Sequence, residues 1–121
     1  MFSKQLGLML YVDDVAAERD FWQAVGFEIL DYRQEMGFDN FDMKPAPDSN
    51  LTITVYDKVF IQQVSPEVAS NVPSILFETD DIDQLQKRIA SLTDTCSPVS
   101  DVPFKNFHFA SPSGIYFAVK A

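Results

Sequence analysis

The stretch LYVDDV at residues 10–15 returns in altered form as LFETDDI at residues 76–82. In both places an apolar segment ends in two aspartates, and a helical pattern follows. Asp80 lies 67 residues after Asp13, so each copy fills about half of the 121-residue chain. A repeat of this length is one supersecondary unit. The sequence therefore predicts an α+β fold made of two βαβββ modules that pack side by side as one domain.

The first module, about residues 1–66, begins with a strand over residues 6–12 whose Leu8, Leu10 and Val12 share the face expected to meet a helix. That helix begins at Asp13 or Asp14 and carries Phe21 and Trp22 toward the core, and it ends before Gly26, which suits a left-handed C-terminal residue. Further strands are expected at residues 27–32, 38–43, 51–56 and 59–64, with the last two forming a hairpin.

The second module, about residues 71–121, follows a segment of linker composition at residues 65–71. We predict a strand over residues 73–79 and a helix that begins at Asp81, with Gln84 completing a capping-box pattern. The helix presents one apolar stripe of Ile82, Leu85, Ile89 and Leu92. The module closes with strands at residues 106–110 and 115–119 around a turn at Gly114, and its Phe107, Phe109 and Phe117 alternate toward the core.

The charge balance limits the possible partners. The chain has 9 Lys and Arg against 18 Asp and Glu, for a net charge of −9. This charge repels nucleic acid and anionic membranes and favours a cationic or neutral ligand. Because Cys96 is the only cysteine and no signal-peptide pattern or membrane-length apolar run is present, we expect a cytoplasmic protein.

The order of these motifs resembles the vicinal-oxygen-chelate superfamily of glyoxalases, bleomycin-resistance proteins and extradiol dioxygenases. The resemblance rests on the strand that ends in Asp-Asp, the Phe21-Trp22 helix, Gly26-Phe27, and SPSGIYF at residues 111–117. It implies paired βαβββ modules whose mixed sheet curves into a cleft, often completed by a second subunit. It also implies a divalent metal held there by His and Glu side chains.

The metal ligands of the resembled family are not matched. The resemblance places its two histidines at Gly7 and Ser74, and its two glutamates near Gln62 and at Ala118. A catalytic metal site needs about three strong nitrogen or oxygen ligands. We therefore predict no divalent metal and no other cofactor, and a binding protein rather than an enzyme.

Two residues are candidates for chemistry. His108 is the only histidine, and it alternates away from Phe107 and Phe109, so on a cleft face it is a candidate general base or hydrogen-bond donor. The alternative is a solvent-facing or structurally bonded histidine. Glu78 shares a strand face with Ser74, where it either meets a ligand cation or forms a structural salt bridge.

The predicted function is the binding of a small cationic or aromatic compound, such as an antibiotic, by a homodimer. Aromatic side chains exceed polar functional groups, and ring-lined clefts bind planar or cationic ligands. Two alternatives stay open: a glyoxalase-like lyase or isomerase with a nonstandard site at His108 and Glu78, and a non-catalytic interaction module. The predicted ligand-binding residues are Tyr11, Gln62, Ser74, Glu78, His108 and Tyr116.

Overall fold

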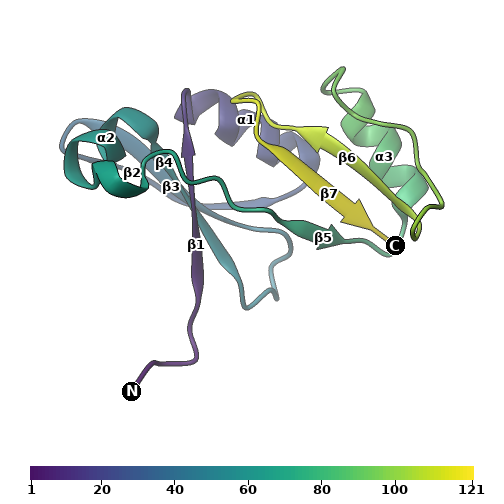
Figure 1. Cartoon of the computed structure of the whole chain (residues 1–121), viewed down its shortest axis with the longest axis horizontal. Coiled ribbons are helices and arrows are strands. Elements are labelled where there is room, and N and C mark those ends of the chain that lie inside the picture. The colour runs from purple at the N-terminus through teal and green to yellow at the C-terminus, as the bar shows by residue number, and fades with distance from the viewer. The chain divides into compact units, whose positions relative to one another are not determined.

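A strand, a helix and three strands follow one another in the first half of the chain, as the sequence predicts. The computed structural model describes residues 1–121 and divides into two units, Met1–Val72 and Pro73–Ala121 (Figure 1). In the first unit the strands have the order β1-β4-β3-β2, with β1 parallel to β4 and the other pairs antiparallel. The elements of this sheet and its helix are β1 (Gly7–Val12), α1 (Val15–Val25), β2 (Glu28–Glu35), β3 (Phe38–Lys44) and β4 (Thr52–Asp57).

The predicted ends of α1 are confirmed. The carboxylate of Asp14 accepts a hydrogen bond from the backbone N–H of Ala17 at 3.0 Å, which satisfies one of the unpaired amides at a helix start. Gly26 ends the helix at φ 115°, a conformation that costs other residues energy. The core of the unit lies between α1 and one face of the sheet, where Leu10, Trp22 and Phe41 are fully buried.

The predicted strand at residues 59–64 is wrong, because this segment forms helix α2 (Lys58–Val64). The carboxylate of Asp57 accepts a hydrogen bond from the N–H of Val59 at 2.8 Å and caps the helix. Phe60 and Ile61 are buried, whereas Val59 and Val64 are exposed. That pattern has the period of a helix and not the alternation of a strand, and a short 3₁₀ helix, η1 (Pro66–Val68), follows.

The second unit contains β5 (Leu76–Glu78), α3 (Ile82–Ala90), β6 (Asn106–Ala110) and β7 (Tyr116–Lys120). Its three strands have the order β5-β7-β6, with β5 parallel and β6 antiparallel to β7. The predicted cap of α3 is confirmed, since Asp81 Oδ1 accepts from the N–H of Gln84 at 3.1 Å. The predicted core positions of this unit are confirmed for Phe107, Phe109, Phe117, Ile82 and Ile89.

Two elements of this unit are shorter than the sequence predicts. The strand expected at residues 73–79 is regular only over the three residues of β5. Leu92 lies beyond the end of α3 and is 42% exposed, so the apolar stripe stops at Ile89. The helix ends at Ala90, before the stripe makes a further turn.

The segment at residues 95–100 lies alongside β6 but is not a regular strand. Hydroxyl groups replace part of the backbone ladder: Thr95 Oγ1 accepts from the N–H of Ala110 at 2.8 Å, and Ser97 Oγ accepts from the N–H of His108 at 2.9 Å. The backbone N–H of Ser97 in turn donates to the carbonyl of His108, also at 2.9 Å. The sheet therefore has three regular strands, and this segment forms an irregular edge beside β6.

No helix in residues 1–121 has both the length and the apolar character needed to cross a membrane.

Candidate ligand-binding site

Four of the six predicted ligand-binding residues lie on one face of the second sheet. We call this surface the open face of the second unit, because the opposite face carries the buried Phe107, Phe109 and Phe117 and lies toward the core. The strand register places Leu76 beside Ala118 and Ala118 beside His108. Two residues further along the strands in one direction, Glu78 lies beside Lys120; two residues in the other direction, Tyr116 lies beside Ala110. By alternation Ser74, which is exposed, continues the same face ahead of β5.

His108 and Tyr116 form an aromatic pair on this face. Their ring centroids lie 6.1 Å apart with a tilt of 56°, and Tyr116 is 59% exposed. The two residues come from adjacent antiparallel strands and are two pairs apart in register, on the same face, which brings their side chains together diagonally. An exposed pair of rings is suited to stack on a flat ligand.

Glu78 forms a salt bridge, which was one of the two roles that the sequence left open. Its Oε1 lies 3.1 Å from Nζ of Lys120, its neighbour in the register. The glutamate side chain is 71% exposed, so this ion pair contributes little to stability. The pair does place both signs of charge next to the aromatic pair, available to a polar part of a ligand.

The other two predicted ligand-binding residues lie in the first unit, and one was placed wrongly. Gln62 is an exposed residue of α2 and not part of a closing strand. The strand that closes the module is β4, and its Thr52 is the residue in register with Gly7. Tyr11 is half-buried and packs against the small hydrophobic cluster of Phe60, Ile61 and Ala69.

The residues at the family's metal-ligand positions do not fit a divalent metal. Three of the expected positions hold Gly7, Ser74 and Ala118, and the residue of the closing strand β4 in register with Gly7 is Thr52; these side chains offer two hydroxyl groups and no imidazole or carboxylate. Neither unit by itself brings together three or more His, Cys, Asp or Glu side chains that are able to hold a metal ion. The donor set therefore lacks the ligands that structural and catalytic metal sites use.

A polar network on the first sheet was missed by the sequence analysis. Asp42 Oδ1 accepts from Thr54 Oγ1 at 2.7 Å and from Arg33 at 3.3 Å. Next to it on β3, Asn40 is 1% exposed and its Oδ1 has no hydrogen-bond partner. The alternation of FDNFDMK at residues 38–44 indicated that Asn40 and Asp42 share a face, but not which partners that face would meet.

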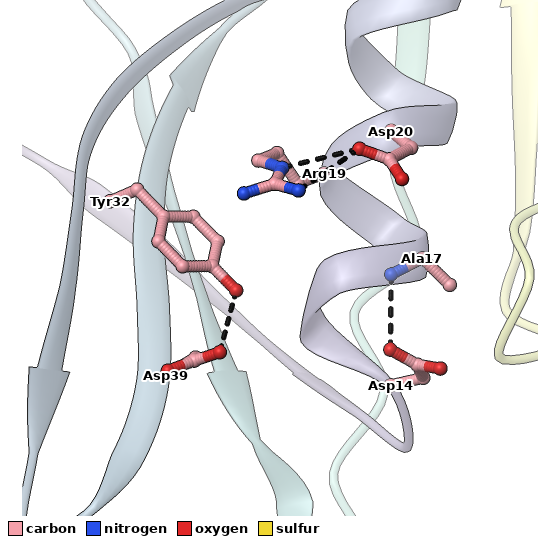
Figure 2. A network of polar contacts seen from close by, with 6 residues as sticks. All are labelled: Asp14, Ala17, Arg19, Asp20, Tyr32 and Asp39. Carbon is pink, nitrogen blue, oxygen red and sulfur yellow. Dashed lines mark hydrogen bonds and ion pairs between the residues drawn. The ribbon is translucent and has the colours of Figure 1, made fainter.

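A shallow hollow of about 370 Å³ in the first unit has a strongly acidic lining. Asp39 accepts from the hydroxyl of Tyr32 at 2.7 Å and from Gln34 at 2.8 Å, and these bonds lower the pKa of its carboxyl. Figure 2 shows the Tyr32 hydroxyl directed at Asp39, with Arg19 nearby. The hollow therefore carries negative charge at neutral pH, and its four carboxylates belong to Asp13, Asp14, Asp39 and Asp57.

Comparison with known proteins identifies the fold. The model of the Glyoxalase/Bleomycin resistance protein/Dioxygenase superfamily matches residues 5–119. Among curated proteins, none matches this chain in sequence. Among solved structures, TnmS3, an antibiotic binding protein from Streptomyces sp. CB03234, is 18% identical with a TM-score of 0.76, covering 98% of this chain and 95% of that one.

Two further solved structures have the same fold. Hypothetical protein SA1046 from S. aureus is 18% identical with a TM-score of 0.77, covering 98% of this chain and 94% of that chain. FosX, a fosfomycin resistance protein from Listeria monocytogenes, is 17% identical with a TM-score of 0.70, covering 98% and 93%. These low identities establish a shared fold and not a shared ligand. The predicted α+β class and fold are thus confirmed, and the chain belongs to the glyoxalase/bleomycin resistance protein/dioxygenase superfamily.

Proposed function

We propose that this chain binds a small aromatic or cationic compound without the help of a divalent metal. The observation that carries the proposal is the open face of the second unit, where His108 and Tyr116 present paired rings in a protein of net charge −9. Rings attract flat and cationic ligands by stacking and by cation–π contact. A solved structure of the same fold is an antibiotic binding protein, which supports a compound of that kind as the ligand.

The residues at the metal-ligand positions support binding in place of metal-assisted chemistry. Gly7 and Ala118 have no donor atoms in their side chains, and Thr52 and Ser74 have only hydroxyls. Glu78 forms an ion pair with Lys120, so its carboxylate is held by a partner other than His108, which a general base would need as an orienting group. The function that remains is recognition, with sequestration of the compound as its outcome.

The proposal is tested by thermal unfolding with proflavine, a flat aromatic cation. At a concentration one hundred times its dissociation constant, a ligand that binds only the folded state adds about 2.7 kcal/mol of stability. For a domain of this size that is a rise in Tm on the order of 10 °C. We expect Tyr116→Ala and His108→Ala to reduce the rise, and Phe104→Ala, which removes an exposed ring outside the aromatic pair, to leave it unchanged.

Two outcomes contradict the proposal. One is that proflavine fails to raise the Tm of the wild-type protein at any soluble concentration. The other is a stoichiometric divalent ion in protein purified without added metal, measured by elemental analysis. Either result removes metal-free recognition of an aromatic cation as the function.

We also propose that the chain works as a homodimer in the cytoplasm. The exposed Leu76 lies on the open face beside the aromatic pair, and a second subunit packed against Leu76 buries this apolar surface while leaving the rings of the pair to the ligand. Sedimentation velocity at micromolar concentration is expected to give twice the 13.7 kDa mass of the chain. A monomer under these conditions contradicts the dimer and leaves the ligand proposal standing.

A further inference from the structure

Asn40 is a buried polar residue whose side chain is not satisfied by the protein. It is 1% exposed, and its Oδ1 has no hydrogen-bond partner. Buried polar atoms are nearly always paired, because a group taken out of water and left without a partner is unfavourable. Ser111 Oγ, in the second unit, is the other side-chain atom in this condition.

The position of Asn40 places this oxygen on the face of the first sheet that carries the polar network. It is in register with Tyr56 of β4 and with Arg33 of β2. Along β3 it alternates with Phe38 and Asp42, which therefore share its face. Asp42 Oδ1 accepts from both Thr54 and Arg33, so these three polar side chains bond to one another and not to Oδ1 of Asn40.

The buried side of helix α2 packs against the neighbours of this unsatisfied oxygen. The ring of Phe60, on α2, lies 5.8 Å from the ring of Phe38 and 5.9 Å from that of Tyr56, centroid to centroid. These two rings flank Asn40 along β3 and across to β4. Tyr11 packs against the same cluster. The side chain that α2 places against Phe38 and Tyr56 is therefore a hydrocarbon ring, which has no hydrogen-bond donor.

Helix α2 has the features of a cover that can move. It is seven residues long and begins directly after β4, and it is drawn in teal in Figure 1. Helices this short are not stable by themselves in water, so α2 depends on the contacts of Phe60 and Ile61. Its outer face leaves Val59 and Val64 50% and 46% exposed.

We propose that a ligand site lies under α2, in which Asn40 Oδ1 accepts a hydrogen bond from an amino group of a flat aromatic ligand. The ligand ring takes the place of Phe60 against Phe38 and Tyr56, and the amino group reaches the Oδ1 of Asn40, which has no partner in the protein. This site lies in the first unit, whereas the open face with His108 and Tyr116 belongs to the second, so the titrations below are made in the Tyr116→Ala background. The inference rests on the proposed binding function and adds a second site with its own ligand chemistry: an aromatic ring that carries an N–H donor. The open form of a covered site of this kind is a minor conformation that the ligand makes dominant.

The test compares two dyes with the same ring, one with N–H donors on its amino groups and one with methyl groups in their place; Asn40→Leu separates the effect of the donor from that of the methyl groups. Proflavine carries two NH₂ groups on an acridinium ring, and acridine orange carries dimethylamino groups at the same positions, with the same ring and charge. Fluorescence titration is expected to give a dissociation constant about tenfold lower for proflavine, the effect of one hydrogen bond to a cationic ligand. The preference is expected to disappear in Asn40→Leu, which keeps the branched shape of the side chain and removes the acceptor.

Ser111→Ala is the matched control. It removes the other unpartnered buried side-chain atom, which lies in the second unit. We expect both variants to fold with Tm values at or above that of the wild type, because neither loses a hydrogen bond. Only Asn40→Leu is expected to change the ratio of the two dissociation constants.

The movement of α2 has its own measurement. Amide hydrogen exchange of residues 58–64 is expected to become faster when proflavine is bound, because the ligand displaces Phe60. Exchange that is unchanged or slower overturns the role of α2 as a cover.

The outcomes separate this inference from the proposed function. If neither dye binds the wild-type protein, both fail. If binding is lost in the Tyr116→Ala background, if the dyes bind equally there, or if the preference for proflavine persists in Asn40→Leu, the inference fails and the binding function stands.

Discussion

Glu18 is a buried carboxylate on the helix face that also carries Phe21 and Trp22 into the core. It is 0% exposed, and its Oε1 accepts from Nε1 of Trp22 at 3.1 Å. An indole N–H in a protein interior needs an acceptor, and the residue four positions earlier on a helix lies close enough to supply one. The sequence analysis identified Trp22 as core but did not identify its partner.

Removing this carboxylate is expected to be costly. We predict that Glu18→Ala lowers the free energy of unfolding by about 2 kcal/mol, because it leaves the indole N–H buried without its bond. Glu18→Gln keeps an acceptor and is expected to lose less. Urea unfolding followed by the fluorescence of Trp22, the only tryptophan, measures both; equal losses for the two variants would show that the bond is not the cause.

Tyr32 is a surface tyrosine held by three kinds of contact. Its ring stacks on Phe41 with centroids 5.9 Å apart, Arg19 lies over it at 4.6 Å, and its hydroxyl donates to Asp39 (Figure 2). Burial of the hydroxyl, followed by the hydrogen bond and the negative charge of Asp39, raises the pKa of Tyr32 to about 12. The folded protein therefore holds this proton more tightly than an unfolded chain does.

This shift predicts how stability changes in alkali. The contribution of Tyr32 is complete below its ordinary pKa of 10.0 and is lost as the pH rises toward about 12. Tyr32→Phe is expected to make the fall in unfolding free energy across this range shallower, measured by urea unfolding at a series of pH values. Tyr116→Phe, which removes a hydroxyl without a carboxylate partner, is the control. Parallel curves for wild type and Tyr32→Phe would refute the linkage.

At the scale of elements, the segment at residues 95–100 shows how hydroxyl side chains complete an edge. Thr95 Oγ1 both accepts from the N–H of Ala110 and donates to its carbonyl at 3.2 Å. Ala110 is 3% exposed, so its backbone groups are far from water. One threonine side chain thus does what a paired strand residue does elsewhere in the sheet.

Thr95→Val tests this replacement. It keeps the shape of the side chain and leaves the N–H of Ala110 without a partner, so we expect the free energy of unfolding to fall by about 1–3 kcal/mol. Thr95→Ser keeps the hydroxyl and is expected to stay close to the wild type. Chemical denaturation of the three proteins is the measurement. A valine variant as stable as the serine variant would mean that the amide finds another partner.

At the scale of the whole molecule, the net charge of −9 acts on every ligand that approaches. The acidic hollow bounded by Asp39 and Asp57 contributes to this field. Exposed charges act over roughly 8 Å at physiological ionic strength and about 30 Å at 0.01 M salt. Attraction of cations is therefore a property that salt reduces.

We expect the affinity for proflavine to fall several-fold between these two salt concentrations, because screening removes the long-range attraction. The anionic dye anilinonaphthalene sulfonate is the control, and its affinity is expected to be unchanged or to rise with salt. Fluorescence titration at both ionic strengths gives the four dissociation constants. A proflavine affinity independent of salt would show that the charge of the protein plays no part in binding.

The sequence by itself determined the repeated strand–helix pattern, the caps at Asp14, Gly26 and Asp81, and the burial of the phenylalanines in β6 and β7. These features are local: a cap bonds to an amide three residues away, and the face of a strand follows from alternation. The segment at residues 59–64 was misread because a short apolar run has no clear period.

Only the tertiary structure decided which distant side chains meet. It paired His108 with Tyr116 and Glu78 with Lys120, and it put α2 over the neighbours of Asn40. Each of these contacts depends on the register of strands that are far apart in the chain, and a shift of one residue moves every side chain to the opposite face. No local pattern contains that register, so the sequence named His108, Tyr116 and Glu78 one by one, and only the fold showed which side chains they meet.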